Sequence, residues 1–217
     1  MTDEARVRRP PPPFRRLAVL RTEQLSPRLR RIVLGGAELE GFPTPAPAAS
    51  VRLLLPPAGS DEIVLPVWTG NQFELPDGSR APIRTMTPRH VDAERLELTI
   101  DVALHEHGAA SDWARAAQPG VISAISGPAR GFSLDPATRS LVLAGDETAL
   151  PAISQLLEVL PDHVRISAYV ELTDPAAEIA LPHRVDGDVA WLETPSDATP
   201  GTAFASAVDA IDELPDE

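Results

Sequence analysis

Residues 140–170, SLVLAGDETALPAISQLLEVLPDHVRISAYV, contain the clearest fold signal in the chain. The run opens with the apolar stretch 140–144, continues through a polar turn, and carries apolar residues at helical spacing over 149–160. Pro151 falls in the first turn of this predicted helix, where a missing N–H costs nothing. A second apolar strand, 164–170, follows directly. Strand–helix–strand order predicts a parallel α/β sheet for this part of the chain.

The sequence on either side extends this division into strands and helices. Residues 189–192 (VAWL) indicate a further strand, and residues 203–214 a final helix with helically spaced apolar residues. Before residue 132 the pattern changes to short strands separated by Gly and Pro turns, which is typical of an antiparallel barrel or sandwich. The segments expected to form strands there are 14–20, 29–34, 50–55, 63–68, 81–87, 95–103 and 121–126, with one helix over 109–117.

These patterns divide the chain into three parts. Residues 1–13, MTDEARVRRPPPP, are polar and end in four prolines, so we expect a disordered or extended leader. Residues 14–132 form the predicted barrel domain. Residues 138–217 form the predicted α/β domain, with the boundary near residues 133–138.

Composition excludes several classes of chemistry. The 217 residues include no cysteine, which excludes disulfide scaffolds, thiolate metal sites and a cysteine nucleophile. All 19 basic residues are arginine, which excludes a Walker-type phosphate loop and lysine Schiff-base chemistry. The serine-hydrolase pattern GxSxG is also absent from the sequence.

The net charge of −13 is unevenly distributed. Residues 1–31 carry nine arginines and three acids, whereas residues 133–217 carry three arginines and seventeen acids. An acidic chain of this kind is a poor general binder of nucleic acid. The sequence has no apolar run long enough to span a membrane and no secretion signal, so we expect a cytoplasmic protein without a membrane span.

Three segments carry residue types suited to an anionic ligand. The first, APIRTMTPR at residues 81–89, places two arginines and a hydroxyl at the end of a predicted strand. Because strand residues alternate between faces, Arg84 and Met86 point one way, while Thr87 and Arg89 point the other. Two arginines beside a turn suit a phosphate-bearing ligand, and ordinary surface arginines are the alternative.

The second segment, DVALHEHGAASDW at residues 101–113, passes from a strand end through Gly108 into the predicted helix. A glycine turn into a helix N-terminus presents unpaired backbone N–H groups to an anion, and a plain link capped by Ser111 is the alternative. His105 and His107 would share a strand face, but without cysteine or a third convergent ligand we expect no metal site. We expect His105 to face a ligand and His107 to face solvent.

The third segment, LAGDETALPAI at residues 143–153, lies where the parallel strand passes into its helix. Open α/β sheets bind ligands at the carboxyl ends of their strands, so the segment is placed at the expected mouth of a site. It is not the dinucleotide pattern GxGxxG, and Asp146 and Glu147 could simply favour the helix N-terminus through its dipole.

In this order the segments resemble the siderophore-interacting protein family, flavin-dependent ferric-siderophore reductases within the wider ferredoxin-reductase-like group. The barrel of that family carries R-x-Y-T-x-R, seen here as RTMTPR at residues 84–89. The matches that follow are D-x-x-x-H at 101–105, a small-residue turn with S-x-W-A at 108–114, P-G at 119–120, a G-P segment at 127–131, DETALPAI at 146–153 and W-L at 191–192.

The resemblance, which runs from residue 14 to residue 192, implies both a fold and an activity. The fold would be a six-stranded antiparallel Greek-key barrel that binds FAD, followed by a parallel-sheet domain like those that bind NAD(P)H. The activity would be reduction of ferric siderophores, with electrons passing from NAD(P)H or ferredoxin through flavin to Fe(III). Release as Fe(II), which hard oxygen ligands hold more weakly, would free the iron from the chelator.

The resemblance also implies roles for particular residues. Arg84 and Arg89 would hold the FAD phosphates, and Thr87 would bond near the reactive ring. Ser111 and the turn amides would hold the pyrophosphate. The other residues expected around the flavin are Met86, Asp101, His105, Gly108, Ala110, Trp113, Asp146 and Thr148. Arg130 is the candidate for contact with an anionic ferric siderophore.

Two departures from the family pattern favour alternatives. Met86 stands where the family has tyrosine, so the hydroxyl and the flat stack are lost while a sulfur–aromatic contact remains available. Family members also continue past the last residue of this chain, so we expect a shortened α/β domain. The main alternative is therefore a flavin-binding degenerate module without efficient nicotinamide-dependent turnover. An interaction domain that keeps the barrel without flavin is the third possibility.

Overall fold

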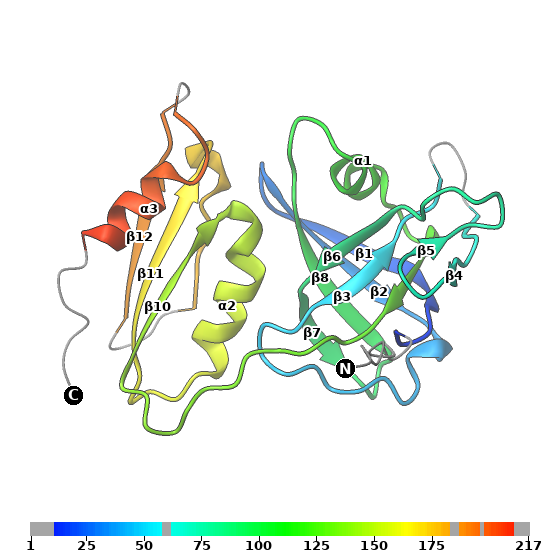
Figure 1. Cartoon of the computed structure of the whole chain (residues 1–217), viewed down its shortest axis with the longest axis horizontal. Helices are drawn as coiled ribbons and strands as arrows, with labels where there is room; N and C mark the ends of the chain where they lie inside the picture. Colours follow the sequence, from blue (N-terminus) through cyan, green and yellow to red (C-terminus); the bar gives the residue numbers. More distant parts are fainter. Residues whose placement is uncertain (1–10, 58–61, 183–186, 196–197, 211–217) are drawn as a thin grey trace, which may run out of the picture.

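The computed structural model describes residues 11–57, 62–182, 187–195 and 198–210. Figure 1 shows two units side by side, a curved antiparallel sheet and a smaller parallel sheet flanked by helices. Most of the predicted leader and the end of the predicted final helix lie outside the described residues.

The first unit is a seven-stranded antiparallel sheet with the order β6-β3-β9-β1-β2-β8-β7. Its strands are β1 (Arg15–Ser26), β2 (Leu29–Gly35), β3 (Val51–Leu54), β6 (Ile83–Met86), β7 (Pro88–Asp92), β8 (Glu97–Ala103) and β9 (Ile122–Ser126). The short strands β4 (Val67–Trp68) and β5 (Phe73–Glu74) form a separate hairpin, so the strand predicted over 63–68 is reduced to two residues. The 3₁₀ helix η1 (Ala37–Leu39) and helix α1 (Ala109–Ala116) complete the unit.

The sheet has seven strands where the resemblance implied six, because β7 follows directly after the predicted strand 81–87, at residues for which no strand was predicted. Strands β6 and β7 are separated only by Thr87, yet β6 pairs with β3 at one edge of the sheet and β7 pairs with β8 at the other. A single residue thus joins the two edges, so the sheet must curl round on itself. The barrel-like architecture is confirmed, and the strand count is corrected by this bend.

Strand alternation determines which residues of the barrel face the second unit. On β8, Leu98, Ile100 and Val102 are buried in the barrel core. The residues between them, Thr99 and Asp101, therefore lie on the outer face. This outer face of β8 is the wall along which both cavities described below are found.

The second unit is a parallel sheet with the order β10-β11-β12, as the strand–helix–strand pattern predicted. Its elements are β10 (Ser140–Asp146), η2 (Glu147–Ala149), α2 (Leu150–Val159), β11 (Arg165–Leu172), η3 (Pro175–Ala177), β12 (Gly187–Glu193) and α3 (Thr202–Asp209). Helix α2 lies between this sheet and the barrel, and α3 lies on the opposite side (Figure 1). The apolar face of α2, including Leu150, Ile153 and Leu157, packs into the core of this unit.

Helix α2 is also the main connection between the two units. The Gln155 side chain accepts a hydrogen bond from the Ala48 N–H at 2.8 Å and donates one to the Pro88 carbonyl oxygen at 3.1 Å. One turn further on, both carboxylate oxygens of Glu158 accept hydrogen bonds from Arg89. These contacts hold β7 of the barrel against α2.

Among the helices of the described residues, none is long and apolar enough to cross a membrane.

Candidate functional site

A cavity of about 340 Å³ lies where the barrel meets the beginning of α2. Strand β6, the end of β8, the beginning of α1 and the first turn of α2 each contribute part of its wall. The lining residues are Ser50, Arg84, Thr85, Met86, Thr87, Asp101, Val102, Ala103, His105, His107, Gly108, Ala109, Ala110, Ser111, Thr148 and Pro151. The structure therefore brings residues from all three predicted segments into one cavity.

Strand β6 presents a cation and a thioether along one side of the cavity. Arg84 lies opposite Leu53 of β3, and Met86 lies opposite Val51, so the two side chains share a face. The Arg84 side chain is exposed, and within the described part of the chain its guanidinium donates only to the neighbouring Ile83 carbonyl oxygen, at 2.9 Å. Met86 is partly buried against the barrel core. The charged end of Arg84 is thus available to a ligand.

The turn from β8 into α1 presents backbone N–H groups to the cavity. Gly108 precedes the helix with φ 140°, a conformation that favours glycine, and a Cβ built there would meet nothing within 4 Å. The N–H groups of Ala109 and Ala110 begin the helix and have no partner within it. A helix start of this kind, facing open space, is suited to an anionic group.

The Ser111 hydroxyl holds this turn in place. The side chain is buried, accepts a hydrogen bond from the His105 N–H at 3.0 Å, and donates to the Ala103 carbonyl oxygen at 3.4 Å. Ser111 lines the cavity, but its hydroxyl is engaged within the β8–α1 connection. His107 lies at the same turn with its side chain 90% exposed, as predicted for a solvated histidine.

Asp101 faces the cavity with its charge already paired. Its carboxylate accepts two hydrogen bonds from Arg31 of the neighbouring strand, at 2.8 and 2.9 Å, and the residue is 5% exposed. The hydrogen bond to Asp101 raises the pKa of the Arg31 guanidinium. Asp101 therefore contributes a neutralised wall rather than a free negative charge.

The second unit closes the cavity with the DETALPAI segment. Asp146 accepts hydrogen bonds from the Thr148 N–H at 2.8 Å and from its hydroxyl at 2.6 Å. Thr148 and Pro151 line the cavity, whereas Asp146 acts on it only through Thr148. The carboxyl end of β10 thus lies beside the barrel residues, as expected for a ligand site in an α/β sheet.

Glu147, whose importance could not be derived from the sequence, links the two units beside the cavity. It is 3% exposed and accepts hydrogen bonds from Arg28 at 2.8 and 3.3 Å and from the Thr173 hydroxyl at 2.9 Å. The His105 ring lies with Nδ1 3.7 Å from the same carboxylate. The hydrogen bond to Glu147 raises the pKa of Arg28. Arg28 lies 119 positions from Glu147, so no local pattern reveals the pair.

Besides Asp146, three predicted site residues lie outside the cavity. Trp113 is 7% exposed and packs into the barrel core together with Ala114 and Ala117, because these positions share the buried face of α1. Arg130 is exposed and lines neither cavity of the described structure, although its neighbour Ala129 donates a hydrogen bond to the Ser50 carbonyl oxygen at the cavity wall.

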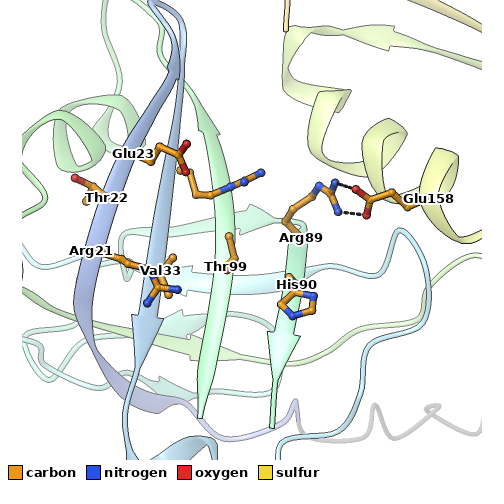
Figure 2. A pocket seen from close by; sticks show the side chains of 9 residues that line it. Arg21, Thr22, Glu23, Val33, Arg89, His90, Thr99 and Glu158 are labelled. Carbon is orange, nitrogen blue, oxygen red and sulfur yellow. Dashed lines mark hydrogen bonds and ion pairs between the residues drawn. The ribbon is translucent and has the colours of Figure 1, made fainter. Parts of the chain in front are cut away.

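The third, Arg89, lines a different cavity of about 400 Å³ near the end of α2. Figure 2 shows its guanidinium directed toward Glu158, while Arg21, Val33 and Thr99 come from the neighbouring strands. Arg84 and Arg89 therefore line different cavities, because β6 and β7 lie at opposite edges of the sheet. Thr87, which was expected on the face of Arg89, lines the first cavity with Arg84 instead. The remaining residues of this second cavity are Thr22, Glu23, Arg31 and His90.

The residues of the first cavity fit a flavin dinucleotide. Arg84 and the N–H groups of Ala109 and Ala110 are donors suited to the diphosphate, and Gly108 leaves open space beside them. Met86 offers a polarisable contact for the ring, and Thr87 adds a hydroxyl. These donors suit a diphosphate, and Met86 and Thr87 are compatible with an aromatic ring beside it.

Two family models match the chain. One, described as the siderophore-interacting FAD-binding domain, matches residues 18–132. The other, described as siderophore-interacting protein, matches residues 138–217. The two matches together take in both sheets.

Individual relatives show the same similarity. An uncharacterised protein of Mycobacterium tuberculosis is 36% identical over 83% of this chain and 65% of its own length. A protein of Escherichia coli named NADPH-dependent ferric-chelate reductase is 37% identical over 82% of this chain and 71% of its own length. The crystal structure of a siderophore utilization protein from T. fusca has a TM-score of 0.81 at 33% identity, covering 95% of this chain and 79% of that one. The chain therefore spans about two thirds of the length of these curated relatives.

Proposed function

The chain belongs to the siderophore-interacting protein family, and on that premise we propose that it is an FAD-dependent reductase of ferric siderophores. The observation that carries the proposal is the single cavity where Arg84, the α1 N-terminus and Thr148 meet between the two sheets. Relatives named ferric-chelate reductase and ferric vibriobactin reductase support the same class of substrate.

We assign the residues at one end of the cavity to the FAD diphosphate. Arg84 and the amides of Ala109 and Ala110 hold the diphosphate, and Ser111 fixes the turn that presents those amides. Bound FAD would supply the redox chemistry, taking electrons from a nicotinamide nucleotide and passing them singly to Fe(III). Of the two arginines expected at the phosphates, we assign this role to Arg84 alone, because Arg89 is held by Glu158.

The remaining residues shape the surroundings of the ring. Met86 packs between the barrel core and the cavity, and Thr148, held by Asp146, faces it from the second unit. The ferric siderophore remains outside the protein core as substrate. Arg130 is exposed next to Ala129, which is anchored at the cavity wall, so it is the arginine proposed to attract an anionic chelate to this rim.

One observation favours a second candidate function. Met86 provides no flat ring to stack on a flavin, so a flavin-binding module with slow turnover is the alternative. Anaerobic mixing of the FAD-loaded protein with a reduced nicotinamide nucleotide separates the two. Loss of the visible flavin absorbance, and its return when a ferric siderophore is added, supports the reductase. Retained absorbance with NADH, NADPH and reduced ferredoxin alike would exclude it.

A further inference from the structure

The carboxyl ends of β10, β11 and β12 form the edge at which a dinucleotide binds in an open parallel sheet, so they decide which nucleotide this chain accepts. An inference about this edge rests on the proposed function, because a nicotinamide donor is part of that proposal. The flavin cavity is lined by Thr148 and Pro151 at this same edge. A donor bound here would therefore lie against the proposed flavin.

The helix starts at this edge are already capped by carboxylates of the chain itself. Asp146 accepts from the Thr148 N–H at 2.8 Å. Asp174 accepts from the Ala176 N–H at 2.9 Å. Glu171, which is 1% exposed, accepts from the N–H groups at the beginning of α3; its three partners are Gly201 at 2.7 Å, Ala203 at 3.1 Å and Phe204 at 3.1 Å. These five backbone donors, which would otherwise be available to a phosphate, are therefore occupied.

The arginines in the described part of the second unit lie away from this edge. Within its described residues, Arg139 directly precedes β10 and Arg165 is the first residue of β11, so both are at the amino ends of their strands. Arg28 reaches the carboxyl edge from the barrel, but Glu147 binds its guanidinium. The last residue of β12 is the exposed acid Glu193, which lies opposite Leu172 at the end of β11.

From this arrangement we infer that the donor site accepts NADH and rejects NADPH. The 2′-phosphate of NADPH carries nearly two negative charges and needs arginine or a similar cation at the strand ends. Here it would meet Asp174 and Glu193 instead. The 2′-hydroxyl of NADH, in contrast, can donate a hydrogen bond to a carboxylate at the end of the second strand, which is the position of Asp174. One Asp174 oxygen caps Ala176, and the carboxylate has a second oxygen to offer.

Two measurements on the FAD-loaded chain test this inference. Isothermal titration calorimetry with NAD⁺ and NADP⁺ compares their affinities without any turnover. Anaerobic stopped-flow mixing with NADH and NADPH compares their rates of flavin reduction. We expect the affinity for NAD⁺ to exceed that for NADP⁺ by at least about tenfold, and NADH to reduce the flavin at least about tenfold faster than NADPH.

Charge changes at opposite ends of one strand provide a matched comparison. Glu193→Arg places a cation at the carboxyl edge and should shift the NADP⁺/NAD⁺ affinity ratio about tenfold toward NADP⁺. Asp188→Arg makes the same charge change near the beginning of β12, roughly 16 Å away, beyond the screening length of physiological salt, and should leave the ratio unchanged. Asp174→Asn keeps an oxygen for the Ala176 N–H and should weaken NAD⁺ binding severalfold.

A preference for NADP⁺, equal binding of both nucleotides, or binding of neither would each overturn the inference. So would an equal shift of the ratio in Glu193→Arg and Asp188→Arg. Failure of the proposed function itself is detected separately, by reducing the bound flavin chemically with dithionite and adding a ferric chelate. Reoxidation in that experiment keeps the reductase proposal intact whatever the nucleotide result.

Discussion

Arg84 has the most specific role in the proposed flavin binding. Its guanidinium is exposed at the cavity wall and, among the described residues, is bonded only to the adjacent carbonyl oxygen. Arg84→Ala should weaken FAD binding by about 1.5 kcal/mol or more, because a charge-assisted hydrogen bond to phosphate is lost. Fluorescence titration with FAD measures this change. Arg80→Ala is the control, since Arg80 is also exposed but does not line the cavity; equal losses in both variants would refute the assignment.

A substitution at Met86 tests whether this side chain contacts the flavin ring. Met86→Tyr restores the flat side chain of the family pattern and should tighten FAD binding or leave it unchanged. Spectrophotometric titration of the purified variant with FAD gives the comparison. A clear loss of affinity would show that the site has been rebuilt around methionine.

For individual residues, the sequence predicted several that line one cavity, but it did not predict the partners that hold each side chain. Arg84, Asp101 and Thr148 were expected together and do line one cavity. Arg84 and Arg89 were expected together at the FAD phosphates, but Arg89 is held by a partner that lies 69 positions away on α2. Nothing local to Arg89 indicates that partner.

Glu171 shows how a single buried carboxylate supports an element, the helix α3. Burial by itself would raise its pKa, but interactions with the Thr194 side chain and with the backbone N–H groups at the beginning of α3 outweigh this and lower the pKa below its ordinary value. Its stabilising contribution is therefore present above about pH 4.5 and is lost as pH falls through the lowered pKa. Glu171→Gln should cost about 1–3 kcal/mol at pH 7, measured by urea denaturation. The exposed Glu193→Gln should change stability by less than about 0.5 kcal/mol, and a similar cost in both would contradict the role.

The stabilising contribution of the contact between α2 and β7 should also decrease as the pH falls. Hydrogen bonding to Arg89 lowers the pKa of Glu158, so this pair contributes to stability above about pH 4.5 and loses its contribution below the lowered value. Glu158 is 43% exposed, so the effect is small. Glu158→Gln should cost about 0.5 kcal/mol at pH 7 and nothing at acid pH, where Glu158 is protonated, as measured by denaturation at both pH values. An undiminished cost in acid would contradict this reading.

The elements themselves could be predicted where their signals are local. Strand β10, helix α2 and strand β11 follow from apolar runs and spacing within residues 140–170. The break between β6 and β7 could not be predicted, because it arises from pairing with β3 on one side and β8 on the other. The same reason hides the Arg28–Glu147 contact, since its partners belong to different sheets.

For the whole molecule, the structure shows where the unevenly distributed charges lie. The acids that give residues 133–217 their strong negative charge include those at the carboxyl edge of the parallel sheet, Asp174 and Glu193 among them. The barrel supplies the arginines that meet this unit, through Arg28 at Glu147 and Arg89 at Glu158. Opposite charges thus join the two units beside the cavity proposed to hold the flavin.

Flavin held between these units is proposed to reduce Fe(III), and the stoichiometry of that reaction can be measured. FAD-loaded protein is freed of unbound flavin, reduced anaerobically with dithionite to completion without excess, and mixed with a ferric siderophore and a colour reagent for Fe(II). A two-electron flavin predicts about two Fe(II) for each reduced flavin, together with full return of the oxidised flavin absorbance. Flavin that stays reduced in the presence of the ferric siderophore, with no Fe(II) formed, would contradict the claim.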